Sequence, residues 1–544
     1  MKNPGIRMGL FVGAVLTAPL LGVLYLASEF AELPFSPYDI FDRLTRELPG
    51  SLVTFGIDVM IDTLRFFGLG VADSAKTAER AMAVLQFLFV GMAAGAIYFR
   101  IARNLNRQQA LWTALGIGAV FGVITAIVSI GLGGSTVPTP VVFLWLVGVS
   151  VIWGWTLSAI HARLRVTATD PALSPETTQT GSPISRRQFV IKVGSAAAVI
   201  TVASTGIGSL LSAAARRELD AELAATATDP SPGNNGTILP NANDPVVAAT
   251  GTRPEYTPLE DHYSVSIGTR EIVIDPATWT LPITGLVANP ASLTISDLRD
   301  NFEPMTHFVT LSCISGRVGS ALIGTTEWTG VSVQDVLAQV QPTSDAKYLD
   351  ISSADGFHEL VDINEINNDE RMMLCYEWDG KPLPIDHGFP LRIWRPDRYG
   401  MKQPRWIDSI KVTDKPRDGY WVQRGWDSVA QIQTTSVVDT VAGDSMYESE
   451  GQTLVPVGGI AFAGTRGISK VEVRVDEGPW VEAQLRNPLS GTTWVIWRYD
   501  WPFEAGEHFF SVRCAEGDGT PQIEEERGNR PSGARGIHSR RAKV

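Results

Sequence analysis

Five long apolar stretches in the first 215 residues constrain this chain more than any other feature. A helix needs about 17–25 apolar residues to cross the hydrocarbon core of a bilayer. We therefore predict a membrane anchor of about five transmembrane helices over residues 1–215. The segment 29–80 is interrupted by Asp58, Asp62 and Arg65, and we predict that it lies at the membrane interface. The five stretches run over approximately residues 8–28, 82–99, 109–133, 141–160 and 189–213.

The basic residues of this region predict its orientation, because Lys and Arg accumulate on the cytoplasmic side of membrane spans. They precede the first stretch and occupy two alternate connections, whereas the other connections are acidic or uncharged. We expect the N-terminus inside the cell and everything after residue 215 outside the cytoplasm. The segment SRRQFVIK (185–192) also resembles a twin-arginine export signal, and two ordinary cytoplasmic arginines are the alternative interpretation. The basic residues are Lys2, Arg7, Arg100, Arg103, Arg107, Arg163, Arg165, Arg186, Arg187 and Lys192.

The remainder of the chain has the mixed composition of a soluble protein. Residues 216–255 are rich in Ala, Thr, Pro, Asn and Gly, which is typical of a linker. Short apolar runs and capped helical segments over 256–425 predict an α+β domain. Short alternating strands with turns over 426–544 predict an immunoglobulin-like β-sandwich, and we expect a frayed tail from Gly528 onward.

Composition excludes several classes of function. The chain has 45 Lys and Arg against 58 Asp and Glu, a net charge of −13, so it lacks a general footprint for nucleic acid. Three cysteines are too few for a disulfide scaffold. Among the seven histidines only His161 touches an apolar stretch, so we expect no haem in the anchor. Any redox partner must then be another chain.

Cys313 is the first candidate for chemistry. It ends the apolar strand HFVTLSC (307–313) and is followed by a glycine-containing loop and Arg317. A thiol beside a cation has a lowered pKa and suits nucleophilic or metal-binding work, whereas a buried free cysteine is the alternative. Cys375 and Cys514 have apolar strand contexts, and a disulfide between them stays open. Familiar hydrolase, phosphate-binding and zinc motifs are absent from the sequence.

Four separated segments in a fixed order resemble one family. VTLSCISGRVGS (309–320), TTEWTGVSVQDVL (325–337) and YEWDGKPLPIDHGFPLRIWRPDRYGMKQPRWIDSIKV (376–412) resemble the molybdenum-cofactor domain of the sulfite oxidase superfamily. GGIAFAGTRGISKVEVRVDEGPW (458–480) is similar to the C-terminal dimerisation domain of that family. The resemblance covers about residues 256–530. It implies an α-helical membrane anchor followed by a sulfite-oxidase-type α+β domain and an immunoglobulin-like sandwich.

The resemblance also implies a cofactor and a set of site residues. Mo-molybdopterin is expected, with Cys313 as the protein thiolate on molybdenum, which is a soft ligand for such a metal. Arg317 in the cysteine loop and Arg466 in the sandwich correspond to catalytic positions. The expected cofactor-binding residues are His262, Tyr263, Cys313, Asp355, His387, Arg392, Gln403, Pro404 and Arg405.

The chain departs from the sulfite pattern at three places. Sulfite is a dianion, and its oxidation needs several cations next to the metal-bound oxygen. Val318 stands where sulfite oxidases carry a second arginine, HYSVSI (262–267) lacks another, and Phe357 replaces an expected tyrosine. Sulfite turnover should be weak unless Arg398 or Lys402 supplies the missing charge.

Three hypotheses follow. The first is a membrane-anchored, extracytoplasmic oxidoreductase that transfers an oxygen atom to or from a small-molecule substrate. The second is a reductase similar to methionine-sulfoxide reductases, since a sulfoxide is neutral. The third is a non-enzymatic cell-surface binding module on a degenerate scaffold. The expected partners are the membrane, a separate cytochrome or membrane redox protein and, through the C-terminal domain, a second copy of the chain.

Overall fold

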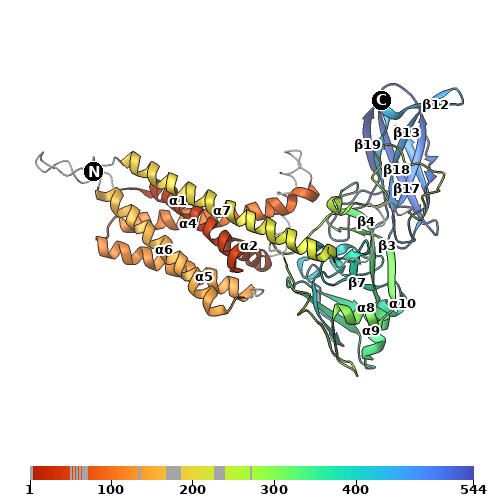
Figure 1. Ribbon diagram of the computed structural model, residues 1–544. Helices are drawn as coiled ribbons and strands as arrows, with labels where there is room; N and C mark the ends of the chain where they lie inside the picture. Colours follow the sequence, from red (N-terminus) through yellow and green to blue (C-terminus); the bar gives the residue numbers. More distant parts are fainter. Residues whose placement is uncertain are drawn as a thin grey trace, which may run out of the picture.

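The long apolar helices and the β-rich part of this chain occupy opposite ends of an elongated molecule (Figure 1). The computed structural model describes residues 4–48, 71–132, 137–166, 186–225, 239–269 and 272–544, together with isolated positions between 52 and 63. Asp58, Asp62 and Arg65 of the predicted interfacial segment lie outside the described residues, as do 226–238 of the predicted linker.

In the described part of the chain, five helices are long and apolar enough to cross a membrane, as the sequence predicts. The first and second of these pack closely because small residues face one another. A Cβ atom added to Gly9 would lie 2.6 Å from the carbonyl oxygen of Gly95, and one added to Gly13 would lie 2.5 Å from that of Gly91. Small residues four apart let two helix backbones approach and gain van der Waals contact. The helices are α1 (Ile6–Ala31), α4 (Val71–Ala102), α5 (Arg107–Leu132), α6 (Thr139–Val166) and α7 (Arg186–Ala225).

A shorter helix, α2 (Ser36–Glu47), lies at the end of the bundle that faces the strands (Figure 1). Its 12 residues span about 18 Å, which is too short to cross a bilayer. At the other end, the Arg165 guanidinium donates to the carbonyls of Ala102 and Leu105 at 3.2 and 2.9 Å. Two of the predicted basic clusters therefore lie together, at the end of the bundle away from the β-rich part.

Two sheets and three short helices build the region between residues 281 and 413. One sheet has the order β2-β1-β10-β5-β6, in which only β1 and β10 pair in parallel, and the other has the order β3-β4-β7-β8 with β9 on β7. Both sheets contribute to one core, which includes Ile283, Val331 and Leu374. The elements are β1 (Leu281–Gly285), β2 (Ala291–Leu293), α8 (Ile295–Asn301), β3 (Pro304–Ser312), β4 (Ile323–Ser332), α9 (Val333–Val340), β5 (Tyr348–Ser353), β6 (His358–Asp362), α10 (Ile363–Asn368), β7 (Met373–Trp378), β8 (Lys381–Pro382), β9 (Arg392–Trp394) and β10 (Ile407–Thr413).

Short polar caps begin α8 and α9, at Thr294 and, as the sequence predicts, at Ser332. The Thr294 hydroxyl accepts from the Asp297 backbone N–H at 3.1 Å, and the Asp297 carboxylate accepts from the Thr294 N–H at 2.8 Å, so the two residues form a capping box for α8. Ser332 caps α9 in the same way, through the backbone N–H of Asp335. These caps fix where each helix leaves its sheet.

Two antiparallel sheets face each other in the C-terminal part. Their orders are β11-β13-β17-β16, with β12 on β13, and β15-β14-β18-β19. Val455, Val473, Trp497 and Phe510 are fully buried between them. The strands are β11 (Thr435–Val441), β12 (Tyr447–Ser449), β13 (Gln452–Phe462), β14 (Ile468–Val475), β15 (Val481–Glu482), β16 (Gln484–Leu485), β17 (Val495–Pro502), β18 (Glu507–Glu516) and β19 (His538–Lys543).

The structure differs from the sequence prediction at both ends of this soluble part. The C-terminal run from Gly528 is not a frayed tail, because β19 pairs with β18 in a register that places His538 opposite Val512. Before the domain, α7 continues to Ala225 and so covers the first part of the predicted linker. One of the short apolar runs that the sequence predicts as strands, EIVID (271–275), is not a strand over residues 272–275, and residue 271 lies outside the described residues.

Candidate functional site

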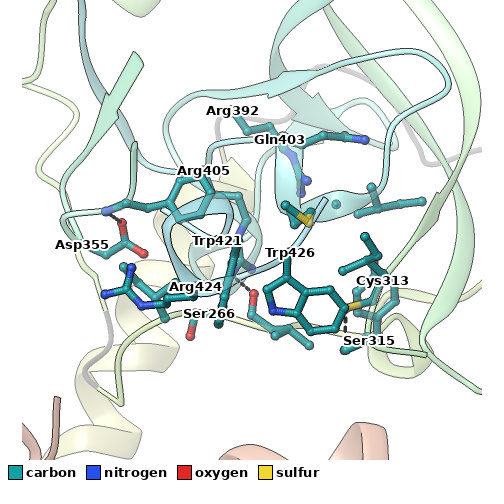
Figure 2. A pocket seen from close by; sticks show the side chains of 18 of the residues that line it. Ser266, Cys313, Ser315, Asp355, Arg392, Gln403, Arg405, Trp421, Arg424 and Trp426 are labelled. Carbon is teal, nitrogen blue, oxygen red and sulfur yellow. Dashed lines mark hydrogen bonds between the residues drawn. The ribbon is translucent and has the colours of Figure 1, made fainter. Parts of the chain in front are cut away.

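One cavity of the α+β domain collects most of the site residues that the sequence predicts (Figure 2). Its walls come from loops and strand ends rather than from one element. The first wall is the segment Tyr263–Ile267, and the second is the end of β3 at Cys313. The third is the stretch from η2 (Ile385–His387) through η3 (Gly400–Lys402). The predicted residues that line the cavity are Tyr263, Cys313, Asp355, His387, Arg392, Gln403 and Arg405.

Cys313 directly follows β3 and faces this cavity. Its backbone N–H donates to the Leu322 carbonyl at 2.9 Å, which closes the loop between the two residues. Its Sγ lies 3.1 Å from the Ser315 hydroxyl oxygen. Burial raises the pKa of the Cys313 thiol, while the hydrogen bond from Ser315 and the charge of Arg405 oppose that rise. The expected lowering of this pKa by a neighbouring arginine is therefore wrong.

The other two cysteines have no place in this cavity. Both are free and buried, Cys375 in β7 and Cys514 in β18. The disulfide that the sequence left open is not formed, because the two strands belong to different sheets of different parts of the chain.

Two buried histidines and a tryptophan pack together at the cavity wall, where His387 is part of the lining. The rings of His262 and His387 both contact Trp378, with centroid separations of 4.8 and 4.5 Å. Burial lowers the pKa of His262 to about 3 and lowers that of His387 well below its ordinary value. Both rings are therefore neutral at ordinary pH, and each can donate one hydrogen bond.

Two arginines approach the cavity from the same side. The Arg392 guanidinium lies 4.2 Å from the Trp328 ring centroid and donates to the His387 carbonyl at 2.9 Å. The Arg405 guanidinium donates to the Asp386 carbonyl at 2.7 Å and to the Ser264 hydroxyl at 3.1 Å. Burial lowers the pKa of Arg392 to about 9, and the charge of Arg405 adds to that effect. A bound anion would reverse this lowering, because an opposite charge favours the cationic form.

Several buried polar atoms around the cavity have no hydrogen-bond partner among the described residues. They are His262 Nε2, Tyr263 Oη, Arg392 Nε and Gln403 Oε1. Buried polar groups are normally paired, so such a cluster points to a polar ligand. Donors for a phosphate, polar contacts for a ring system and a thiol for a metal are all present. These residues fit a molybdenum–pterin cofactor.

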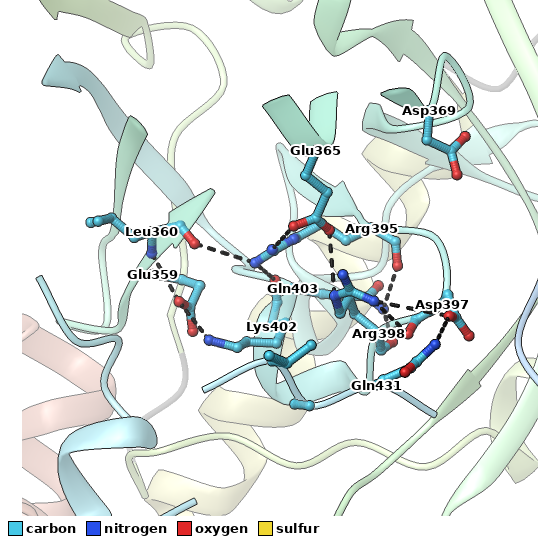
Figure 3. Close-up of polar contacts among 12 residues, drawn as sticks. Glu359, Leu360, Glu365, Asp369, Arg395, Asp397, Arg398, Lys402, Gln403 and Gln431 are labelled. Atoms are coloured by element: carbon cyan, nitrogen blue, oxygen red, sulfur yellow. Dashed lines mark hydrogen bonds and ion pairs between the residues drawn. The ribbon is translucent and has the colours of Figure 1, made fainter. Parts of the chain in front are cut away.

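A network of ion pairs positions the segment that carries Gln403 and Arg405 (Figure 3). Lys402 Nζ lies 2.9 Å from Glu359 Oε1, and Arg395 Nη2 lies 2.7 Å from Glu365 Oε2. Arg398 also contacts Glu365, with its Nε at 3.4 Å from Oε1. Arg398 and Lys402 are thus engaged away from the cavity, and neither lines it.

The remaining predicted residues lie outside this cavity. Arg317 lines a smaller neighbouring cavity that also reaches Cys313. The Arg466 guanidinium forms ion pairs with Asp397 and with Glu516, at 2.9 Å for the latter. Pro404 accepts a backbone hydrogen bond from the Ile393 N–H at 3.1 Å, so it supports the wall without lining it. His262 packs with His387 and Trp378 at the cavity wall, as described above.

Sequence reasoning missed one wall of the cavity entirely. Trp421, Arg424 and Trp426 come from the connection between the two soluble parts, and Asn529 and Arg530 come from the segment expected to fray. Asn529 Nδ2 donates to the Ser315 carbonyl at 2.6 Å, and the Arg530 guanidinium lies 4.6 Å from the Trp426 ring centroid. The only sequence signal was the concentration of aromatic residues near position 421.

Comparisons with known proteins find a matching family and several relatives for the β-rich part of this chain. Residues 268–421 match the family described as oxidoreductase molybdopterin binding domain. The chain is 26% identical over 260 residues to a nitrate reductase [NADPH] of Fusarium oxysporum, which covers 39% of this chain and 29% of that protein. It is 27% identical over 273 residues to a sulfite oxidase of Arabidopsis thaliana, which covers 42% of this chain and 69% of that protein. The chain thus spans less than a third of the fungal relative.

Among solved structures, the sulfane dehydrogenase SoxCD from Paracoccus pantotrophus aligns with a TM-score of 0.45 and 20% identity, over 51% of this chain and 78% of that one. The family match and the two groups of curated relatives agree in type. Over residues 268–421 this chain therefore matches a molybdopterin-binding oxidoreductase domain, and its β-rich part is similar to sulfite oxidases and nitrate reductases.

Proposed function

We propose that this protein is a membrane-anchored molybdenum-cofactor oxidoreductase that transfers an oxygen atom to or from a small substrate. The observation that carries the proposal is the convergence of Cys313, His387, Arg392, Gln403 and Arg405 on one cavity. Cys313 follows β3, whereas the other four residues lie between β8 and β10, so the fold brings two separate segments together.

Each side chain has a role that follows from its chemistry. When bound, the molybdenum–pterin group supplies a two-electron centre that exchanges oxygen with substrate. Cys313 would hold the metal through its thiolate, because a soft ligand suits this metal. Arg392 and Arg405 would bind the phosphate of the pterin through charge-assisted hydrogen bonds. His387 and Tyr263 would hold the ring system through their buried polar atoms.

The cavity lining combines apolar surface with the guanidinium groups of Arg392, Arg405, Arg424 and Arg530. Ile267, Phe357, Met401 and Trp426 present apolar surface to the cavity. Neither Arg398 nor Lys402 replaces the cations that the sulfite pattern requires, since both form ion pairs with carboxylates. This observation supports the second candidate, reduction of a neutral sulfoxide of the methionine-sulfoxide type.

We further propose that the helical bundle anchors the β-rich part outside the cytoplasm. The grouping of Arg165 with the α4–α5 turn supports this orientation, because it gathers basic residues at one end of the bundle. Arg186 and Arg187 would act as a twin-arginine signal. The C-terminal sandwich would be an immunoglobulin-like dimerisation domain, and a separate cytochrome or membrane redox protein would exchange electrons with the site.

Metal and pterin analysis of the purified full chain tests the proposal. We expect about one molybdenum and one pterin per chain. A metal-free and pterin-free protein from a host that makes the cofactor would contradict it. Steady-state assays with sulfite and with methionine sulfoxide, using artificial electron carriers, then separate the two candidate reactions. Efficient sulfite turnover at micromolar KM would show that our assignment of the missing cations is wrong.

A further inference from the structure

The loop Tyr263–Thr269 separates the cavity from the helical bundle. Its inner face lines the cavity through Tyr263, Val265, Ser266 and Ile267. Its outer face meets α2, where the Asp42 carboxylate accepts the Thr269 backbone N–H at 3.0 and 3.1 Å and the Thr269 hydroxyl at 2.9 Å. Asp42 is only 5% exposed. One carboxylate of the bundle therefore holds the end of a cavity wall.

Two side chains near the start of α4 also contact this loop. Lys76 Nζ donates to the Ser266 hydroxyl at 2.9 Å and also to the Gly268 carbonyl. Arg80 Nε donates to the Thr269 carbonyl at 3.4 Å. The polar groups on the outer face of the loop are thus paired with side chains from helices that lie about 190 residues earlier in the chain.

A second cavity wall meets α2 at Arg46. Its Nη2 donates to the Asp355 carbonyl at 2.8 Å. A Cβ atom added to Gly356, which has a φ of +84°, would lie 2.9 Å from Arg46 Nη1, so the turn fits closely around the guanidinium. The Arg46 carbonyl in turn accepts from Arg424 Nη2 at 3.4 Å. Asp355 and Arg424 both line the cavity.

We propose that Asp42, Arg46 and Lys76 form a clamp that positions the loop Tyr263–Thr269 and the turn at Asp355 against the cavity. The bundle is then part of the site's architecture and not only its tether. The clamp residues are positioning residues, since the structure places none of them in the cavity lining. What the cavity holds rests on the proposed function, but the clamp itself does not.

The two walls need the clamp because both are loops. Both are loops without strand partners on their outer side, and loops of this kind open locally at low free-energy cost. The same walls carry Tyr263 and contact Arg405 at Ser264, so they must be ordered before the cavity can hold a charged ligand. Charged hydrogen-bond partners from the bundle supply that order in advance, which lowers the cost of binding.

Hydrogen exchange of the full chain in detergent micelles tests the clamp. The variants are Asp42→Ala and Arg46→Ala, and Arg43→Ala is the matched control on the same helix. Arg43 forms an exposed i,i+4 ion pair with Glu47, at 2.6 Å. We expect amides of 263–269 to exchange about tenfold faster in Asp42→Ala and those of 355–357 about tenfold faster in Arg46→Ala. The control should match the unaltered protein.

Two further variants distinguish loss of the clamp from misfolding of the protein. Asp42→Asn keeps one acceptor oxygen and should restore part of the protection at Thr269. Thr269→Val removes the hydroxyl from the loop side and should reproduce part of the Asp42→Ala effect. In cofactor-loaded protein, the clamp variants should raise KM about tenfold with little change in kcat. Unchanged exchange in both loops would overturn the clamp, whereas absence of molybdenum alone would overturn only the proposed function.

Discussion

Lys402 and Glu359 form a buried ion pair, with 2.9 Å between Nζ and Oε1 and side-chain exposures of only 5% and 1%. Burial lowers the pKa of Lys402, and the neighbouring Glu359 carboxylate opposes that change. The pair joins β6 to η3, the turn that presents Met401 and Gln403 to the cavity.

The first prediction concerns this pair. Lys402→Ala leaves the Glu359 carboxylate buried without its partner, and removing one member of a buried pair costs about 3–5 kcal/mol. We expect a corresponding loss in the free energy of unfolding of the full chain, measured by thermal or denaturant unfolding. Lys470→Ala is the control, because its pair with Glu472 has a lysine that is 42% exposed and should contribute about 0–1 kcal/mol. Equal effects of the two substitutions would contradict the structural role.

The second prediction concerns the thiol. Cys313→Ser should abolish turnover and lower the molybdenum content, because a hydroxyl is a poor substitute for a soft thiolate. Cys514→Ala, which alters a buried cysteine far from the cavity, should retain both. Metal analysis and activity of the two purified variants are the measurements. Full activity in Cys313→Ser would refute its assignment as the metal ligand.

The third prediction concerns the C-terminal wall. Arg530→Ala removes one of the guanidinium groups that line the cavity, and one charge-assisted contact contributes about 1.5–3 kcal/mol. We expect KM for an anionic substrate such as sulfite to rise roughly tenfold to a hundredfold, with a smaller effect for a neutral sulfoxide. Arg535→Ala is the control, since Arg535 pairs with the exposed Glu525. Equal losses for both substrates would indicate a structural role instead.

The fourth prediction concerns pH. His508 Nδ1 lies 2.8 Å from Asp476 Oδ2, and this hydrogen bond raises the pKa of His508 and lowers that of Asp476. The histidine contribution to stability is present below its ordinary pKa and is lost as pH rises through the raised value. The aspartate contribution is present above its ordinary pKa and is lost as pH falls through the lowered value.

The difference in Tm between the unaltered chain and Asp476→Asn should therefore be largest between about pH 4 and pH 6.5, the two ordinary pKa values. It should shrink on either side. Thermal unfolding over a pH series measures it, and a difference that does not change with pH would show that the pair is not ionised.

The fifth prediction concerns membrane orientation. An alkaline phosphatase fused after residue 230 should be active, and the same enzyme fused near residue 105 should be inactive, because basic residues mark the cytoplasmic ends of the spans. The reverse pattern would overturn the extracytoplasmic placement. Replacing Arg186 and Arg187 by Lys should block export if they form a twin-arginine signal.

Local sequence patterns predicted the parts of the fold that depend on local physics. The five apolar helices, the strand ending at Cys313 and the capped helix after Ser332 all follow from periodicity and capping. The cavity residues from His387 to Arg405 were expected because their continuous segment resembles that of a known family. Such features need no knowledge of distant contacts.

Long-range pairing explains what the sequence could not predict. Arg466 was expected at the site, yet it pairs with Asp397 and Glu516, and nothing local to it reveals those partners. The segment with Arg530 and the strand after it were expected to fray, because a Gly-rich and Arg-rich run is typical of a disordered tail. Its order depends on pairing with β18, which the local sequence does not reveal. The pKa of Cys313 was misjudged for the same reason, since burial depends on the whole fold.

The order of the cavity walls along the chain has a consequence for biosynthesis. The wall that carries Asn529 and Arg530 is made more than 200 residues after the thiol at Cys313. A nascent chain therefore contains the Cys313 thiol before all walls of the cavity have been made. The cavity therefore has all of its walls only after Asn529 and Arg530 have been translated.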